Sequence, residues 1–150
     1  MKTNFCYAFI LALAAVLLSC KKEFPADPPG VKDLTVSGCK TKGETFKGDE
    51  PEYITFKTVN DFYLLVNHIN SMFNCEPGEI IVSLEITGNT ITIDENESTS
   101  LVNCICPFDV EFKLGPLEYG DYTLIFQKGG WTFKKYSLDF KKSTDDRVDI

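Results

Sequence analysis

Apolar side chains recur at every second position through much of this 150-residue chain. In Ile80–Thr87 the even-numbered residues are all aliphatic, and in Phe108–Leu114 they are all apolar. A period of two is that of a β-strand with one buried face, because successive side chains point to opposite sides of a sheet. Gly88-Asn89 then supplies a two-residue turn into Thr90–Ile93, which predicts a β-hairpin. The pattern therefore predicts an all-β chain.

Strand signals continue on both sides of that hairpin. Phe62–Phe73 is ambiguous, since its apolar spacing also fits a helix, but its β-branched and aromatic content and the preceding Asn60-Asp61 turn favour a strand. Seven or eight short strands, with turns about every 8–12 residues, are typical of a sandwich or a small barrel, and we expect a single immunoglobulin-like antiparallel β-sandwich. The expected strands are Lys32–Ser37, Tyr53–Val59, Phe62–Phe73, Ile80–Thr87, Thr90–Ile93, Phe108–Leu114, Tyr122–Phe126 and Trp131–Phe140.

The last of these strands has an irregular pattern. Its apolar residues occupy odd-numbered positions up to Phe133 and even-numbered positions from Tyr136 onward. One extra residue near Lys134-Lys135 would shift the alternation in this way, and an extra residue in one strand of a pair is a β-bulge.

The amino-terminal segment has the layout of a secretory signal. Lys2 is followed by an apolar run, Phe5–Leu18, that is shorter than the roughly 20 residues of a membrane-spanning helix. The run ends in Leu17-Leu18-Ser19-Cys20, which resembles the bacterial lipobox. That resemblance implies that residues 1–19 are removed as a lipoprotein signal peptide and that Cys20 is acylated, so that the buried acyl chains anchor the protein to a membrane.

The rest of the chain divides into three parts. Residues 20–30 comprise the lipidated Cys20 and a proline-rich tether, residues 31–142 are expected to form the β-sandwich, and residues 143–150 lack periodicity and are expected to be a flexible tail. The absence of aspartate directly after Cys20 is typical of outer-membrane lipoproteins, on either the periplasmic face or the cell surface. The formal net charge of −7 argues against nucleic acid as a partner.

Four cysteines remain in the mature domain: Cys39, Cys75, Cys104 and Cys106. An even number of cysteines in an oxidising compartment predicts two disulfides. If the strand after Cys104 is extended through Pro107, both Cys104 and Cys106 face the core, and a bond between these two close neighbours would strain the strand. We therefore expect each of them to pair with one of Cys39 and Cys75, in either combination.

Other kinds of site are less well supported. His68 with Cys75, Cys104 and Cys106 has the composition of a zinc site, but the C-x₂-C spacing is missing, and we expect no metal and no cofactor. A redox C-x-x-C motif and a G-x-S-x-G motif are both absent, so we do not expect an enzyme. Asp94–Glu97 is expected to be a solvated acidic loop, because the glycine and terminal glutamate of an EF-hand calcium loop are missing.

Trp131 is the strongest candidate for contact with a ligand. It directly follows Gly129-Gly130, so it lies at the edge of a loop. A tryptophan in such a place can stack on a sugar or anchor a protein partner, although aromatic residues in a sandwich more often pack in the core.

Several short motifs together resemble a group of small uncharacterised lipoproteins from Gram-negative gut anaerobes. The resemblance covers most of the mature chain and implies a cysteine-stapled immunoglobulin-like sandwich, with no known activity to carry over. We expect a membrane-anchored binding or structural module for a protein or glycan; the alternative is an inhibitor lipoprotein that acts on a lysozyme-like enzyme or a protease. The motifs are His68-x-Asn70, Phe73-Asn74-Cys75, Gly88-Asn89-Thr90-Ile91, Cys104-x-Cys106-x-x-Asp109-Val110, Gly115-Pro116-Leu117 and Gly120-x-Tyr122.

Overall fold

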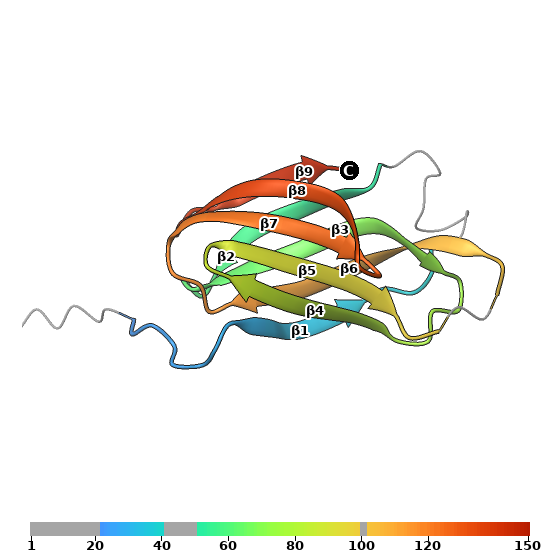
Figure 1. The fold of residues 1–150 in the computed structure, drawn as a ribbon, viewed down its shortest axis with the longest axis horizontal. Helices are drawn as coiled ribbons and strands as arrows, with labels where there is room; N and C mark the ends of the chain where they lie inside the picture. Colours follow the sequence, from blue (N-terminus) through green and yellow to red (C-terminus); the bar gives the residue numbers. More distant parts are fainter. Residues whose placement is uncertain (1–21, 41–50, 100–101) are drawn as a thin grey trace, which may run out of the picture.

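The computed structural model describes residues 22–40, 51–99 and 102–150 (Figure 1). These residues form nine β-strands and no helix, which confirms the predicted all-β class. The predicted signal peptide, residues 1–19, and Cys20 lie outside the described residues. The strands are β1 (Gly30–Val36), β2 (Tyr53–Val59), β3 (Tyr63–Asn74), β4 (Ile80–Thr87), β5 (Thr90–Glu97), β6 (Ile105–Gly115), β7 (Gly120–Lys128), β8 (Trp131–Phe140) and β9 (Asp145–Asp149).

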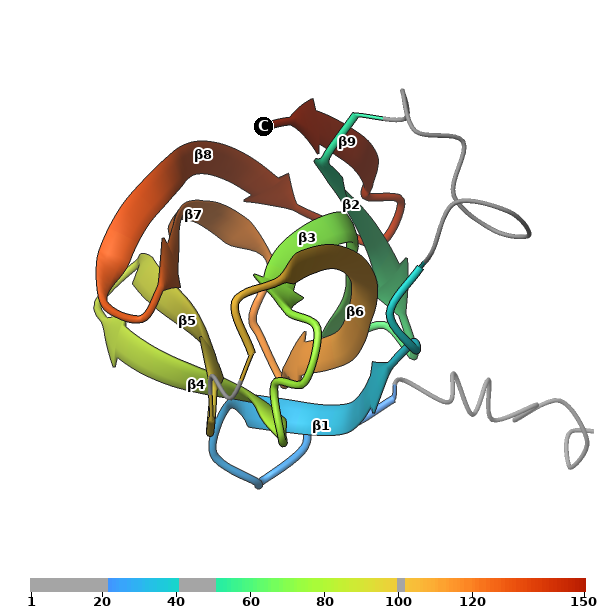
Figure 2. The ribbon, with the colours of Figure 1, turned by 90° about the vertical axis from the view of Figure 1, so that its right-hand side faces the viewer.

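The strands form two sheets packed face to face (Figure 2). One sheet has the order β1-β6-β3-β2-β9 and the other has the order β4-β5-β7-β8. Neighbouring strands are antiparallel except for β5 and β7, which run parallel. The structure confirms the predicted β-sandwich. The prediction that it is antiparallel throughout is wrong at the β5–β7 pair, and the order of the strands differs from that of immunoglobulin domains.

The alternating pattern located most strands closely. β2, β4 and β8 have the bounds that the sequence predicts, and the ambiguous segment Phe62–Phe73 is a strand, β3. The predicted bulge is present one residue earlier than expected: Phe126 pairs with Lys134 and Gln127 with Thr132, so Phe133 has no partner in the ladder. The extra residue turns Phe133 toward the inside of the sandwich, where its ring contacts the ring of Phe126.

Two predictions about polar segments are wrong. Residues 143–150 are not a flexible tail, because β9 pairs with β2 from Lys57↔Asp145 to Tyr53↔Asp149. Asp94–Glu97 is not a solvated loop either, since these residues extend β5 and Glu95 is fully buried. In both segments the backbone hydrogen bonds of a neighbouring strand outweigh the polar composition.

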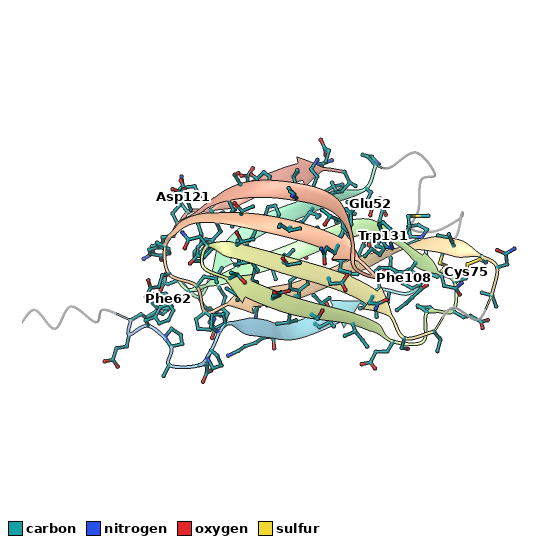
Figure 3. The ribbon with its side chains drawn as sticks, in the orientation of Figure 1. Glu52, Phe62, Cys75, Phe108, Asp121 and Trp131 are labelled. Atoms are coloured by element: carbon teal, nitrogen blue, oxygen red, sulfur yellow. A yellow bond between two sulfur atoms is a disulfide. The ribbon has the colours of Figure 1, made fainter. Side chains whose placement is uncertain are left out.

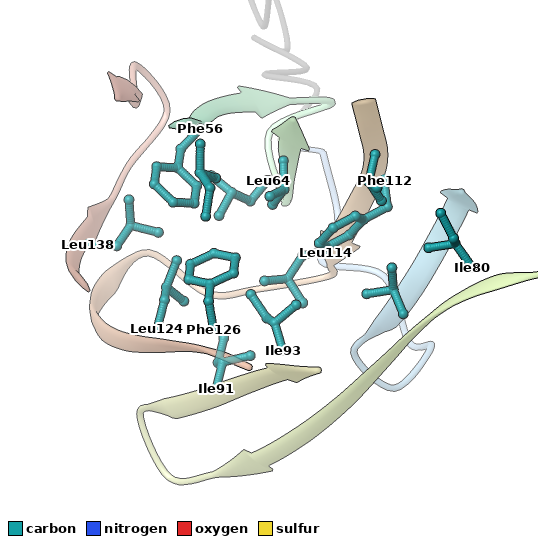
Figure 4. Packing of buried hydrophobic residues seen from close by; sticks show 14 of the residues in the cluster. Phe56, Leu64, Ile80, Ile91, Ile93, Phe112, Leu114, Leu124, Phe126 and Leu138 are labelled. Atoms are coloured by element: carbon teal, nitrogen blue, oxygen red, sulfur yellow. The ribbon is translucent and has the colours of Figure 1, made fainter. Parts of the chain in front are cut away.

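The core fills the space between the sheets (Figure 4). Each large apolar side chain contributes about 1.5–3 kcal/mol by leaving water, so these residues dominate the stability of the sandwich. Aromatic rings from both sheets meet here, with Phe56 stacked on Tyr136 at a centroid distance of 5.2 Å. The largest fully buried side chains are Phe56, Phe112, Phe126, Phe140, Ile54, Leu64, Ile91, Ile93, Leu114, Leu124, Leu138 and His68.

The tether meets the sandwich at one end of its long axis (Figure 3). Residues 22–29 form no strand, but the ring of Phe24 packs edge-on against Phe62 at a centroid distance of 5.2 Å. The ammonium of Lys22 lies 2.9 Å from the carboxylate of Asp61. Trp131 and Cys75 lie toward the opposite end of the molecule, away from the point where the tether enters.

Candidate functional site

Trp131 is the most exposed large apolar residue among the described parts of the chain, with 83% of its surface accessible. It is the first residue of β8 and follows the turn Gly129-Gly130, whose φ angles of 55° and 82° suit glycine. This turn holds the indole at the outer edge of the β7–β8 hairpin. Packing in the core, which is the usual role of tryptophan, does not account for this position.

A shallow groove of about 250 Å³ lies beside the indole. Its walls come from three places: the end of β3, the end of β5 and the β7–β8 hairpin. Apolar and polar groups both line it, and both charge signs are present. The lining residues are Met72, Phe73, Asn96, Glu97, Lys128, Gly129 and Trp131.

A buried polar cluster, which we call the His68 cluster, connects to this groove through Lys128. His68 has no exposed surface, its Nδ1 lies 2.8 Å from Oε2 of the equally buried Glu95, and its Nε2 lies 2.8 Å from Oε1 of Glu52. The hydroxyl of Ser71 donates to Glu95 at 3.1 Å. The ammonium of Lys128 donates to Ser71 at 2.9 Å and lies 3.8 Å from Glu52. The five side chains therefore form a closed ring.

The His68 cluster joins the two sheets. His68 and Ser71 belong to β3 and Glu52 directly precedes β2, whereas Glu95 and Lys128 belong to β5 and β7 of the other sheet. Because carboxylates only accept hydrogen bonds, both ring nitrogens of His68 donate and the imidazole is positively charged. Two cations then balance two carboxylates, which satisfies the requirement that buried charges be paired.

The environment shifts the pKa of three members of the His68 cluster. Burial lowers the pKa of His68, but the hydrogen bonds to Glu52 and Glu95 outweigh burial and raise it above 6.5. Burial raises the pKa of Glu52, but the hydrogen bonds and charges of His68 and Lys128 together outweigh this effect and lower it below 4.5. Burial lowers the pKa of Lys128 more than the nearby carboxylates raise it.

Aromatic rings enclose the charged groups. Phe133, the residue of the bulge, stacks on the ring of His68 at a centroid distance of 5.6 Å. The ammonium of Lys128 lies 4.5 Å from the centre of the Phe73 ring and 5.6 Å from that of Phe133, within the range of cation–π attraction. Lys128 thus contacts the buried His68 cluster and also borders the open groove.

The cysteines form two disulfides within the described ranges, Cys39–Cys106 and Cys75–Cys104. This confirms that Cys104 and Cys106 each pair with one of the other two. The expectation that both face the core holds for Cys106, which is 7% exposed, but not for Cys104, which is exposed because β6 begins only at Ile105. Two disulfides indicate that the domain matures in an oxidising compartment outside the cytoplasm.

The other residues considered as zinc or calcium ligands contact protein groups instead. His68 does not approach the cysteines as a zinc ligand, since both of its nitrogens contact carboxylates. In the segment considered for calcium, Asp94 accepts a hydrogen bond from the backbone of Gly130 at 3.0 Å, and Asn96 accepts one from Glu97 at 2.9 Å. The carboxylate of Asp94 therefore stabilises the turn of the β7–β8 hairpin, and the amide oxygen of Asn96 is bound within its own strand.

Sequence reasoning missed the His68 cluster, although a signal was present. Glu95 continues the buried odd-numbered row of Ile91 and Ile93, and His68 continues the even-numbered row of Leu64 and Val66. A charged residue in a buried row needs a partner of opposite charge. A search for ionisable residues in apolar rows would have found both.

Comparison with known proteins returned no matching family model, no matching curated protein and no matching solved structure. Within the described residues, no helix is long and apolar enough to cross a membrane.

Proposed function

We propose that this chain is a lipid-anchored protein of the bacterial outer membrane whose β-sandwich binds a glycan in the groove beside Trp131. The observation that carries the proposal is the 83% exposure of Trp131 above a shallow groove with mixed polar and apolar walls. A sugar ring offers an apolar face for stacking and hydroxyl groups for hydrogen bonds. Trp131 suits the first, and Asn96 and Glu97 suit the second.

The position of the groove supports display away from a membrane. Cys20, the predicted lipidation site, lies two residues before Lys22, and the tether packs against Phe62. Trp131 lies toward the far end of the sandwich from Phe62 (Figure 3). A domain anchored through Cys20 would therefore present the groove outward.

An inhibitor lipoprotein is the second candidate. The β7–β8 hairpin carries a protruding side chain, and such a loop can enter the active-site cleft of an enzyme. The net charge of −7 would favour a basic target such as a lysozyme. The shallow groove beside the indole favours the glycan. An enzyme that accepts the Trp131 side chain into its own cleft does not require a groove on this protein, whereas a glycan stacked on the indole would occupy it.

A glycan array tests the ligand class, with the purified acylated protein kept in detergent micelles. We expect binding to a set of related glycans and a loss of about 30-fold in affinity for Trp131→Ala, which corresponds to a hot-spot tryptophan worth about 2 kcal/mol. Trp131→Phe should retain part of the affinity. Ile105→Ala is the matched control, since Ile105 is 68% exposed but does not line the groove.

Two results would contradict the glycan proposal. One is equal binding by Trp131→Ala and the unchanged protein. The other is binding to no glycan together with inhibition of a lysozyme or protease that Trp131→Ala abolishes, which would establish the inhibitor function instead. The anchor is tested separately by mass spectrometry of the mature protein, which should begin at an acylated Cys20 and lose the acyl mass and the membrane association in Cys20→Ala.

A further inference from the structure

The two disulfides lie side by side. The sulfur atoms of Cys39, Cys75 and Cys106 are all within 4.8 Å of one another, and the sulfur of Cys104 is bonded to Cys75. Four sulfur atoms from three separate segments are therefore gathered at one end of the sandwich. The cluster is graded in exposure, from the exposed Cys104 through the half-buried Cys39 and Cys75 to the buried Cys106.

Backbone hydrogen bonds hold these segments in place independently of the sulfur–sulfur bonds. The amide of Cys75 donates to the carbonyl of Cys104 at 3.1 Å, and Cys106 pairs with Phe73 in the ladder between β3 and β6. The amide of Lys40 donates to the carbonyl of Pro107 at 2.9 Å, which fixes the backbone next to Cys39. The ammonium of Lys40 also binds Asn70 at 2.8 Å and pairs with Asp109. None of these contacts involves a sulfur atom, so opening the disulfides breaks none of them directly.

We propose that, when both disulfides are reduced, Cys39, Cys75, Cys104 and Cys106 form a four-thiolate zinc site. In a tetrahedral site with Zn–S distances of about 2.3 Å, neighbouring sulfurs are roughly 3.8 Å apart. The sulfurs of Cys39, Cys75 and Cys106 are within 4.8 Å of one another, so shifts of about 1 Å bring these three to that spacing. The exposed Cys104, whose sulfur is bonded to Cys75 in the oxidised form, supplies the fourth ligand by rotation of its side chain. Four soft thiolate ligands favour Zn²⁺ over the hard divalent cations Mg²⁺, Ca²⁺ and Mn²⁺, which prefer oxygen ligands.

The chemistry balances with a dithiol reductant as the electron source. Each disulfide accepts two electrons and two protons and becomes two thiols, while the dithiol becomes a disulfide. The exposed Cys104 makes the Cys75–Cys104 bond the accessible one. The Cys75 thiolate that results lies beside the less accessible Cys39–Cys106 bond and can attack it, which forms a bond between Cys75 and one of these sulfurs and releases the other as a thiolate. The Cys104 thiolate then re-forms the accessible Cys75–Cys104 bond and frees the second sulfur, and a second dithiol reduces Cys75–Cys104 again. One Zn²⁺ then displaces four protons and yields a tetrathiolate with a charge of −2.

Oxidation of the four cysteines therefore controls whether this site binds zinc. In the disulfide form the sulfurs bond one another, and in the reduced form the same backbone presents four thiolates to one ion. The cross-link between three segments is retained in both forms, through covalent bonds in one and through the metal in the other. This inference does not depend on the ligand of the Trp131 groove.

A Co²⁺ titration tests the proposal, with the full acylated protein in detergent, reduced by a phosphine under nitrogen and then freed of reductant. We expect one Co²⁺ per chain with the thiolate-to-metal charge transfer of a tetrahedral site, complete displacement by one equivalent of Zn²⁺, and no such signal from the oxidised protein. Cys104→Ser should lose about a quarter of the charge-transfer intensity, since three thiolates remain of four. Ser83→Ala, on the exposed face of β4, is the control that should bind like the unchanged protein.

Far-ultraviolet circular dichroism of the same samples decides the remaining outcomes. If the reduced chain unfolds without metal, one equivalent of Zn²⁺ should restore the β-sheet spectrum, because binding and folding are then coupled. A reduced, folded chain that binds no Co²⁺ would overturn the proposal. So would a reduced chain that binds the metal while it stays unfolded, since the site is inferred from the native scaffold.

Discussion

The Nδ1 atom of His68 lies 2.8 Å from Oε2 of Glu95, and neither side chain has any exposed surface. The two residues come from opposite sheets of the sandwich. Their contact is the centre of the ring of charges that includes Glu52, Ser71 and Lys128. A buried pair of this kind matters for stability chiefly because removing one member leaves the other charge unpaired.

Glu95→Gln tests that dependence. The substitution preserves shape but removes the negative charge that faces His68, so we expect the free energy of unfolding to fall by about 3–5 kcal/mol. Urea denaturation followed by circular dichroism measures the change. Glu111→Gln is the control, since Glu111 is exposed on β6 and should change stability by less than about 0.5 kcal/mol. Similar stabilities for the two variants would show that the His68 cluster is not a structural centre.

Stability should pass through a plateau between about pH 4.5 and pH 6.5. The pKa of His68 is raised in the folded state, so its contribution is complete below 6.5 and is lost as pH rises through the folded value. The pKa of Glu52 is lowered, so its contribution is complete above 4.5 and is lost as pH falls through the folded value. Urea midpoints across this range measure both effects. His68→Gln should remove the decline on the alkaline side, and a decline that persists in His68→Gln would assign it to another group.

The two disulfides should contribute unequally. Cys39 and Cys106 are 67 residues apart, whereas Cys75 and Cys104 are 29 apart. Loop-closure entropy then gives about 4.4 kcal/mol for the first bond and about 3.6 kcal/mol for the second. Burial of Cys106 adds a packing loss to the first. Paired substitution to serine, Cys39→Ser with Cys106→Ser against Cys75→Ser with Cys104→Ser, leaves no odd thiol. In thermal unfolding at neutral pH, the variant without Cys39–Cys106 should have the lower midpoint temperature. The reverse order of the two midpoints would contradict the prediction.

Removal of β9 should destabilise the whole domain. β9 pairs with five residues of β2, and the hydroxyl of Tyr136 on β8 contacts Asp146, which closes this edge of the sandwich. We expect truncation after Lys142 to lower the free energy of unfolding by on the order of 2 kcal/mol or more, since each lost backbone hydrogen bond is worth about 1 kcal/mol. Removal of Ile150 alone is the control. An unchanged urea midpoint after the longer truncation would show that β9 is dispensable.

The same contact at β9 has a spectroscopic consequence. Burial and the hydrogen bond to Asp146 raise the pKa of Tyr136 to about 12. In an absorbance titration of the phenolates, Asp146→Asn should ionise one tyrosine at a lower pH than the unchanged protein. When Tyr136→Phe is added to both proteins, the titration of the Asp146→Asn variant should no longer differ from that of the protein with Asp146. If the two proteins titrate identically while Tyr136 is present, the contact between Tyr136 and Asp146 is contradicted.

The sequence by itself determined the local features of this protein. Alternation with a period of two identified the strands from β1 to β8 and most of their buried faces, because side-chain direction in a strand depends only on neighbouring residues. It located the bulge in β8 to within a residue, and the close spacing of Cys104 and Cys106 led to the correct prediction that each pairs with a different, distant cysteine. Trp131 was identified as a loop-edge residue from its two preceding glycines.

Only the tertiary structure decided which distant segments meet. Glu95 and His68 are 27 residues apart, Cys39 and Cys106 are 67 apart, and β9 reaches back across the chain to β2. The polar composition of Asp94–Glu97 and of residues 143–150 pointed to solvent, but each segment found a neighbouring strand and, in the case of Glu95, a buried partner charge. Such pairings depend on the register and packing of whole sheets, and no local pattern specifies them.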